Sequence, residues 1–274
     1  MKANKILVYD DYCPLCTWYS DLFVKYKFIE AENRVPFSTV KPEILNAIDV
    51  DKAKDEIPLF DDETKETQYG IDALLAILGQ RWPAIKSIGN HTGAKFFLKR
   101  LYKLVSYNRK VIVAKRCGDG RFDCSPGFNI FYRILFMALF FLFNSSMLYP
   151  LHYNLFTHVS FYHLSFYQLQ LSHMTLVGIN CFLAMCLTPP QSIEYLGQVN
   201  MLALVTILLL VPIMVISIAA SLEWLILAYF IFLTAFVIRE YFRRMTYANI
   251  TREHNGIVAI NFVCLIIFLA YVFH

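Results

Sequence analysis

Charged residues are distributed very unevenly along this chain of 274 residues. Residues 1–127 hold 20 of the 25 lysines and arginines and 17 of the 21 aspartates and glutamates, and residues 128–274 hold the other nine charges. A lipid bilayer excludes charged side chains, whereas a soluble domain carries them on its surface. The chain is therefore predicted to join a soluble domain, residues 1–127, to a helical transmembrane domain, residues 128–274, each of ordinary domain size.

The apolar half predicts about five transmembrane helices, because a spanning helix needs roughly 20 apolar residues. Within 201–238 the only charged residue is Glu223, and this stretch is long enough for two spans that turn back near 219–223. The expected spans are 128–150, 171–187, two within 201–238, and 257–273.

Basic residues beside these spans predict the orientation in the membrane. One basic cluster precedes the first span, a second lies between the fourth and fifth, and residues 151–170 contain no lysine or arginine. Since positive charge stays on the cytoplasmic side, and no apolar leader precedes Ile6, we expect a multi-pass protein of the inner (cytoplasmic) membrane. Its N-terminal domain would lie in the cytoplasm and its C-terminus outside. The clusters are Lys95, Lys99, Arg100, Lys103, Arg109, Lys110, Lys115, Arg116 and Arg121, and then Arg239, Arg243, Arg244 and Arg252.

A CxxC motif follows a short apolar run near the start of the soluble domain. Residues 9–16 read YDDYCPLC, and a helical pattern begins at Pro14. This places two thiols at a helix N-terminus, where the helix dipole favours thiolate. Cys13 is the expected nucleophile and Cys16 the resolving thiol. Asp10 and Asp11 oppose the dipole, because negative charge raises a thiol pKa, and the sequence leaves that balance open. A metal site or a purely structural CxxC are the alternatives.

The order of predicted elements is typical of a thioredoxin-like α/β domain. A strand and the CxxC helix are followed by a short strand, a hairpin and two helices. The helix from Pro14 is expected to carry Trp18, Leu22, Phe23 and Tyr26 on one face. The elements are a strand at 5–9, a helix at about 14–28, a strand at 34–37, a helix or loop at 49–56, hairpin strands at 57–60 and 66–69, a helix at 72–78 ended by Gly79, and a helix at about 94–107.

The CxxC segment resembles the DCC family of thiol–disulfide oxidoreductases, whose motif is Y-D-G-x-C-x-x-C. Residues 68–75, 101–102 and 107–109 are also similar to that family, so the resemblance covers residues 5 to about 126. It implies a thioredoxin-like fold and a redox dithiol, with the Ile57–Pro58 peptide as a cis-proline beside the thiols. The expected site residues are thus Cys13, Cys16, Pro58 and Asp10. Asp11 departs from the family motif, which has glycine there.

Two further cysteines, Cys117 and Cys124, lie just before the apolar half. With Cys13 and Cys16 they make four thiols, which a structural zinc ion would accept, although their spacing is wider than in the usual zinc knuckle. They are equally a candidate second redox pair. The favoured interpretation is a turn that docks the soluble domain on the bilayer.

Four histidines gather in the expected outer part of the transmembrane domain, among many tyrosines and phenylalanines. They are His152, His158, His163 and His173. Such a cluster is a candidate haem, copper or quinone site. The favoured alternative is an aromatic belt at the membrane interface, and no cofactor or metal is therefore expected.

Thiol exchange with a membrane partner is the function that the sequence favours. The cysteines within the spans are Cys181, Cys186 and Cys264, which are expected to act as small apolar residues, and the loop 151–170 contains none. A partner in the membrane would therefore supply the other thiols. The alternative is a non-enzymatic accessory subunit of a larger membrane complex, with the soluble domain as a docking module. The net charge of +4 is modest and gives no indication of nucleic-acid binding.

Overall fold

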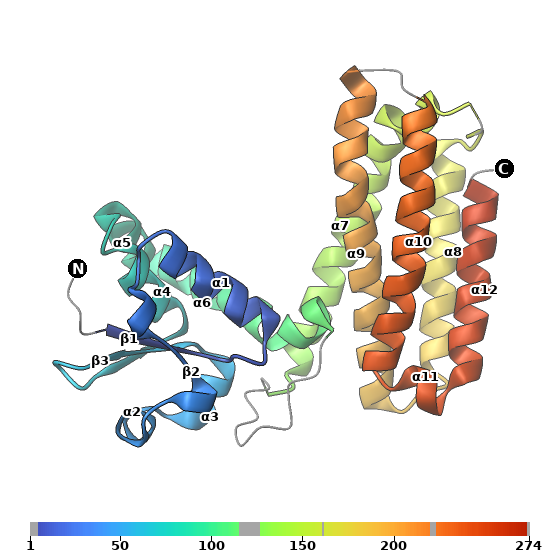
Figure 1. The fold of residues 1–274 in the computed structure, drawn as a ribbon. Coiled ribbons are helices and arrows are strands. Elements are labelled where there is room, and N and C mark those ends of the chain that lie inside the picture. Colours follow the sequence, from blue (N-terminus) through green and yellow to red (C-terminus); the bar gives the residue numbers. More distant parts are fainter. Residues whose placement is uncertain (1–4, 115–126, 161, 220–222, 273–274) are drawn as a thin grey trace. The chain divides into compact units, whose positions relative to one another are not determined.

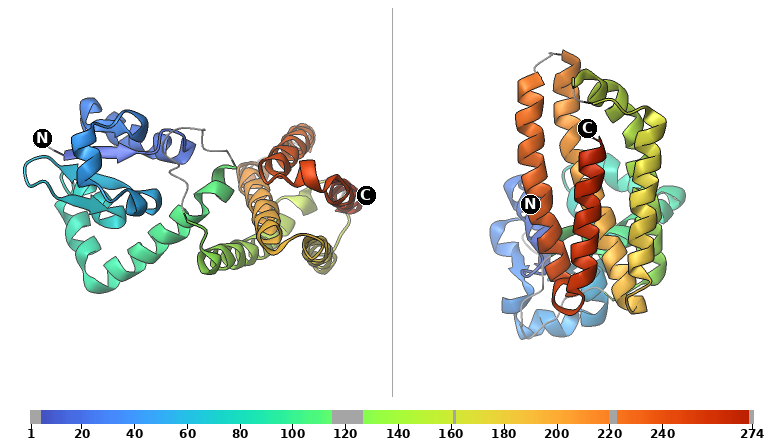
Figure 2. Two further views of the ribbon diagram at one scale, coloured as in Figure 1. Left: turned by 90° about the horizontal axis from the view of Figure 1, so that it is seen from below. Right: turned by 90° about the vertical axis from the view of Figure 1, so that its right-hand side faces the viewer.

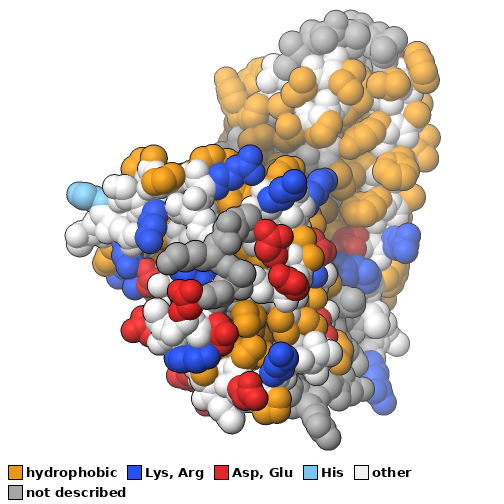
Figure 3. All heavy atoms as spheres, turned by 60° about the vertical axis from the view of Figure 1, so that its left-hand side comes forward, with side chains coloured by type: hydrophobic (Ala, Val, Ile, Leu, Met, Phe, Trp, Pro, Cys, Tyr) orange, Lys and Arg blue, Asp and Glu red, His pale blue; other side chains and the backbone are white. Residues whose placement is uncertain are grey.

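The computed structural model describes residues 5–114, 127–160, 162–219 and 223–272 (Figure 1). The chain forms two compact units, Met1–Arg133 and Ile134–His274. The first unit contains a small sheet with helices and the second is helical. Figure 3 shows charged side chains gathered on the first unit and hydrophobic ones covering most of the visible second unit.

The sheet of the first unit has the strand order β2-β1-β3-β4. Central strand β1 runs parallel to β2 and antiparallel to β3, and β3 forms a hairpin with β4. The expected strands are thus confirmed, with small differences at their ends. The four strands are β1 (Lys5–Tyr9), β2 (Arg34–Pro36), β3 (Pro58–Asp61) and β4 (Thr67–Tyr69).

Both faces of the sheet are buried. Successive side chains in a strand point to opposite sides, and neighbouring residues of β1 and β3 pack into different core clusters. Leu7 and Leu59 pack on one face with Ile77, whereas Val8 and Phe60 pack on the other. The helices of the first unit are α1 (Pro14–Lys25), α2 (Pro42–Ala47), α3 (Val50–Asp55), α4 (Gly70–Leu78), α5 (Pro83–Asn90) and α6 (Thr92–Val113), with short 3-10 turns at Ala31–Asn33 and Phe37–Thr39.

The buried face of α1 includes only part of the predicted one. Phe23 packs against the core as a member of the predicted face, but Trp18 and Tyr26 are more than half exposed. Cys16 and Ser20 are the buried residues of α1, and Tyr19, one position after Trp18, packs against the core in its place.

The second unit consists of long helices that run alongside one another (Figures 1 and 2). Four helical stretches are long and apolar enough to cross a membrane: Ile130–His158, Pro189–Ser217, Glu223–Tyr247 and Asn255–Val272. Four of the approximately five expected spans are thus supported. The helices are α7 (Ile130–Asn154), α8 (Phe166–Ala184), α9 (Pro189–Ala219), α10 (Glu223–Tyr247), α11 (Ile250–Glu253) and α12 (Asn255–Val272), with a 3-10 turn at Phe156–His158.

Helix α8 is not one of these candidate spans, although residues 171–187 were expected to form one. Its first half contains Gln168, Gln170 and His173, which lower its mean hydropathy. Its second half is held by polar contacts: the Tyr195 hydroxyl donates to Asn180 Oδ1 at 2.7 Å, and Asn261 Nδ2 donates to the same atom at 2.5 Å. One amide of α8 thus joins α9 and α12.

A charged cluster joins α9 to α10. Arg244 is 2% exposed and donates through Nη1 to Gln198 Oε1 at 2.9 Å. Its Nε lies 2.8 Å from Glu240 Oε1. The exposed Arg243 also bonds Glu240, through Nε at 2.7 Å and Nη2 at 2.6 Å.

Candidate active site at the Cys13–Cys16 dithiol

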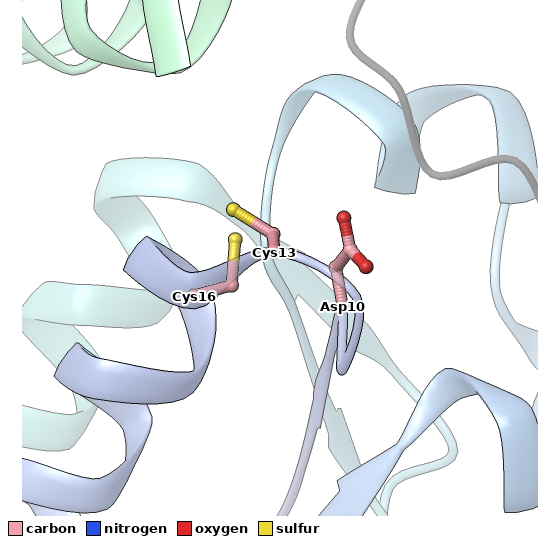
Figure 4. A group of neighbouring side chains, drawn as sticks. All are labelled: Asp10, Cys13 and Cys16. Carbon is pink, nitrogen blue, oxygen red and sulfur yellow. The ribbon is translucent and has the colours of Figure 1, made fainter. Parts of the chain in front are cut away.

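The CxxC lies where β1 ends and α1 begins (Figure 4). Asp10 makes the turn, because its Oδ1 accepts from the Tyr12 N–H at 3.0 Å and its carbonyl accepts from the Cys13 N–H at 3.3 Å. Cys13 is the N-cap residue of α1, and Pro14 begins the helix. Proline suits this position because its missing N–H would have no partner there. The predicted placement of the thiols at a helix N-terminus is therefore observed.

The pKa values of the two thiols are shifted in opposite directions. Figure 4 shows both sulfur atoms on the same side of the turn, and Cys13 is 6% exposed and Cys16 3%. A hydrogen bond from Cys16 lowers the pKa of Cys13 to about 6, helped by the Cys16 N–H and the charge of Arg109, and opposed by burial and by Asp10. The same hydrogen bond, together with burial, raises the pKa of Cys16. Cys13 is thus the thiolate and Cys16 the thiol of the reduced pair.

Arg109 reaches the dithiol from α6. Its Nη1 lies 3.7 Å from Cys16 Sγ, its Nη2 donates to the Lys54 carbonyl at 2.6 Å, and its Nη2 lies 4.0 Å from Asp10 Oδ2. The side chain is 9% exposed. From the sequence, Arg109 is expected only as one of the cations that set the membrane orientation, and its place at the thiols is not predicted.

One face of α6 holds the chain segment that precedes Pro58. The Tyr102 hydroxyl accepts from the Ile57 N–H at 2.9 Å, and the Ser106 hydroxyl donates to the Asp55 carbonyl. Together with Arg109, these residues have the i, i+4, i+7 spacing of one helix face. That spacing was the available signal, but the predicted helix ended near residue 107, whereas α6 continues to Val113.

Pro58 begins β3 and is buried. The expected cis-proline is wrong, since the described residues contain no cis peptide bond. The peptide before Pro58 is fixed instead by two hydrogen bonds of Ile57, whose N–H donates to Tyr102 and whose carbonyl accepts from the Gly70 N–H at 2.9 Å. In the described contacts, this segment is linked to the dithiol through Lys54 and Arg109.

The two aspartates of the motif have separate roles. Burial raises the pKa of the Asp10 carboxyl, opposed by the charge of Arg109, and its Oδ2 has no hydrogen-bond partner among the described residues. Asp11 instead accepts from the Ser38 hydroxyl at 2.8 Å. The Asp11 carboxylate is thus bound to the 3-10 turn that follows β2.

A metal ion could find three donors here. Asp10, Cys13 and Cys16 are the one group in the described part of the chain whose ligand atoms, all within 4.8 Å of one another, could hold a metal. The Arg109 guanidinium beside them disfavours a cation, because it places a positive charge at the same thiols. The four-thiol zinc site also needs Cys117 and Cys124, which lie outside the described residues.

The histidine cluster of the second unit is not assembled into a ligand set in the described structure. His152 Nδ1 lies 2.9 Å from the Tyr162 hydroxyl, and His173 Nε2 lies 3.3 Å from the Ser145 hydroxyl, whereas His158 and His163 are exposed. His152 packs among aromatic rings, including those of Tyr153 and Phe166.

No protein-family model matches this chain, and no curated protein or solved structure shows significant similarity to it. The function of this chain therefore has to be inferred from the residues of the site and their geometry.

Proposed function

We propose that this chain is a membrane-anchored thiol–disulfide oxidoreductase that acts through Cys13 and Cys16. The observation that carries the proposal is the asymmetric thiol pair at the N-terminus of α1, in which one pKa is lowered to about 6 and the other is raised. A lowered pKa provides a thiolate nucleophile at neutral pH, and the protonated neighbour is held ready as the second thiol.

The fold of the first unit is consistent with a thioredoxin-like domain of the DCC type. The parallel β1–β2 pair flanks α1, the β3–β4 hairpin completes the order β2-β1-β3-β4, and the dithiol follows the central strand. The trans peptide before Pro58 is the feature that departs from this assignment.

The proposed reaction is a two-step exchange. The Cys13 thiolate attacks one sulfur of a partner's disulfide, so that a Cys13–partner S–S bond forms and the partner's other sulfur leaves as a thiolate, which takes up a proton. Cys16 then loses its proton and attacks Cys13 Sγ, which releases the partner's second thiolate. The Cys13–Cys16 pair is thereby oxidised by two electrons and the partner's disulfide is reduced. The same steps in reverse oxidise a partner.

Asp10 and Arg109 would both assist the exchange reaction. Arg109 is a positioning residue whose charge lowers the pKa of both thiols. Asp10 is the candidate acceptor for the Cys16 proton, because one of its carboxylate oxygens lies within 4.8 Å of both sulfurs and its buried Oδ2 makes no hydrogen bond in the described structure. Its raised pKa makes it a better base than an ordinary carboxylate.

Trapping in native membranes tests the proposal. Cys16→Ser removes the resolving thiol, so that a partner should stay disulfide-linked to Cys13 and be identified after non-reducing separation. The matched control is Cys13→Ser with Cys16 retained, which should trap nothing. An adduct that forms equally in both variants, or in neither while another oxidoreductase of the same cells traps its partner, would overturn the exchange function.

An accessory subunit of a membrane complex is the second candidate, and it is favoured by the burial of both thiols. A nucleophile that is 6% exposed cannot meet a partner's disulfide until the turn around it opens. This candidate predicts that Cys13→Ser is tolerated in cells, and that substitutions on lipid-exposed side chains such as Phe232 and Ile267 disrupt a complex seen by native electrophoresis.

The proposed location is the inner membrane with the first unit in the cytoplasm. Five crossings place the C-terminus outside, whereas the four candidate spans alone would return it to the cytoplasm. A reporter fused after His274 that is active only outside the cytoplasm decides between them. Activity supports a crossing by α8 and the predicted orientation, and inactivity together with an active reporter placed in the 151–165 segment would contradict the fifth span.

A further inference from the structure

A second concave site lies in the first unit, away from the thiols. It is a cavity of about 620 Å³ between α3, β4, α4, α5 and α6, which falls within the range of roughly 300–1,000 Å³ typical of small-molecule sites. None of the dithiol residues lines it. The cavity is lined by five lysines, namely Lys52, Lys86, Lys95, Lys99 and Lys103.

Three of these lysines form a stripe along α6. Lys95, Lys99 and Lys103 have the i, i+4, i+8 spacing of one helix face, and like charges at this spacing destabilise a helix by a few tenths of a kcal/mol per pair. Asp72 offsets part of this repulsion, because it lies 2.6 Å from Lys95 Nζ and 3.4 Å from Lys99 Nζ. Glu56 lies 3.8 Å from Lys103 Nζ.

The remaining two lysines have no carboxylate partner among the described residues. Lys52 lies over the Tyr69 ring, with Nζ 4.3 Å from its centroid, and Lys86 is exposed at the mouth of the cavity on α5. Five cations face two carboxylates, so the cavity carries a net positive charge. A concave surface of one charge sign concentrates its field and attracts a counter-ion.

The residue types of the lining select the ligand chemistry. The cations are all lysines, whose ammonium groups bind phosphate as point charges. Five of them around one cavity match a ligand with several negative charges, such as a diphosphate, better than a single carboxylate. Asn90 and Gln68 add amide groups at the wall, and Ile71 and Leu75 provide an apolar part.

We propose that this lysine cavity binds a ligand bearing a phosphate or diphosphate group. The inference does not depend on the redox function, because the cavity shares no residue with Asp10, Cys13, Cys16 or Arg109. Its failure and the failure of the exchange function are therefore separate outcomes.

Calorimetric titration of the full chain in detergent micelles with inorganic pyrophosphate tests this site. We expect saturable binding at low ionic strength that weakens as salt is added, since these lysines are partly exposed. Lys52→Gln with Lys86→Gln should weaken binding about tenfold, at roughly 0.7 kcal/mol per lost charge. Asp72→Asn should tighten it, because this change frees Lys95 and Lys99 from their carboxylate.

The matched control is Lys25→Gln with Lys41→Gln, which makes the same change in net charge at two exposed lysines outside the cavity. Binding by this variant should stay within about twofold of the wild type. The proposal is overturned by no saturable binding to the wild type, by an equal loss in the control variant, or by weaker binding in Asp72→Asn.

The same titration in nanodiscs identifies the source of the phosphate. Weaker pyrophosphate binding in nanodiscs of anionic phosphatidylglycerol than in nanodiscs of phosphatidylcholine would indicate competition by the lipid. If this difference is lost in the Lys52/Lys86 variant, the cavity is assigned to a lipid headgroup. Equal pyrophosphate affinity in both kinds of nanodisc would assign it to a soluble phosphate compound.

Discussion

Arg109 in the first unit and Arg244 in the second are both buried, but they have different neighbours. Arg244 lies 2.8 Å from the Glu240 carboxylate and bonds Gln198. The carboxylate neighbour of Arg109 is Asp10, at 4.0 Å, and its guanidinium bonds instead to a backbone carbonyl and approaches a thiol. The charge of Arg244 is thus balanced by a nearby carboxylate, whereas that of Arg109 acts on the dithiol.

This difference separates a structural buried charge from a functional one. A buried ion pair with good geometry roughly balances its own desolvation, and removing one partner leaves the other exposed to the full penalty. A buried cation beside ionisable thiols changes their acidity instead. The two arginines should therefore respond in different ways to the same substitution.

The largest effect is expected from Arg244→Met. Arg243 still bonds Glu240 in this variant, but the fully buried Gln198 loses its Arg244 donor. An unsatisfied buried acceptor of this kind should destabilise the second unit by about 2–3 kcal/mol. Unfolding of the full chain in micelles by a denaturing detergent, followed by circular dichroism, measures this. Arg243→Met is the matched control: its side chain is 42% exposed, so a loss within about 1 kcal/mol is expected. Equal losses would contradict the structural role of Arg244.

A pH dependence should distinguish the first unit. The pKa of Cys13 is about 6 in the folded protein against an ordinary value of 9.0, so its stabilising contribution is complete above pH 9 and is lost as pH falls towards 6. The raised pKa of Cys16 changes the stability only at pH values above the ordinary pKa of a cysteine thiol. As pH rises from 6 to 9, the free energy of unfolding of the reduced protein should thus increase by at most about 1.4 kcal/mol per pH unit.

Urea unfolding of the full chain in a Trp224→Phe background measures this dependence, because Trp18 and Trp82 then report on the first unit alone. Cys13→Ser in the same background should remove the slope between pH 6 and 9. A slope that persists in Cys13→Ser would assign the pH dependence to another group and contradict the lowered pKa.

Replacing Arg109 should change reactivity more than stability. Arg109→Met removes a charge that lowers the pKa of Cys13, and we expect the midpoint of the alkylation rate against pH to rise by about one unit, or roughly 1.4 kcal/mol. Arg109→Lys keeps the charge and should shift it less. Arg100→Met, on an exposed position of the same helix, is the control, and a shift of equal size there would exclude a local effect.

The smallest effect is expected at the uncharged polar contact of the second unit. Asn261→Leu removes one donor to Asn180 but leaves the Tyr195 hydrogen bond, and single interhelical hydrogen bonds in membranes contribute about 0.6 kcal/mol on average. Detergent-induced unfolding should shift accordingly. A loss as large as that in Arg244→Met would show that this amide is as important for stability as the buried arginine.

Local sequence patterns were sufficient to predict the position of the dithiol. Cys13, at the end of a β-type run and before Pro14, had to lie at a helix N-terminus, and the hairpin strands around residues 61–64 were marked by their turn residues. The apolar runs of the second half predicted helices in the same way. Each of these signals lies within a few residues of the element that it predicts.

Tertiary contacts explain what could not be predicted. The burial of Arg109 depends on how α6 packs against residues 54–57. Its spacing from Tyr102 and Ser106 places all three on one helix face, but the spacing does not say what that face contacts. The polar residues of α8, such as Asn180, are satisfied by helices that follow it in the chain, so the hydropathy of α8 alone says little about its place. The cis assignment of Pro58 depended on resemblance and was wrong.

The bonds of Asn180 also have a consequence for biosynthesis. Its acceptor oxygen is bonded by Tyr195 of α9 and by Asn261 of α12, the last helix of the chain. While the ribosome is still making α10, half of this arrangement does not yet exist. Helix α8 therefore reaches its full set of hydrogen bonds only after α12 has been made, and until then the buried Asn180 has one of its two partners.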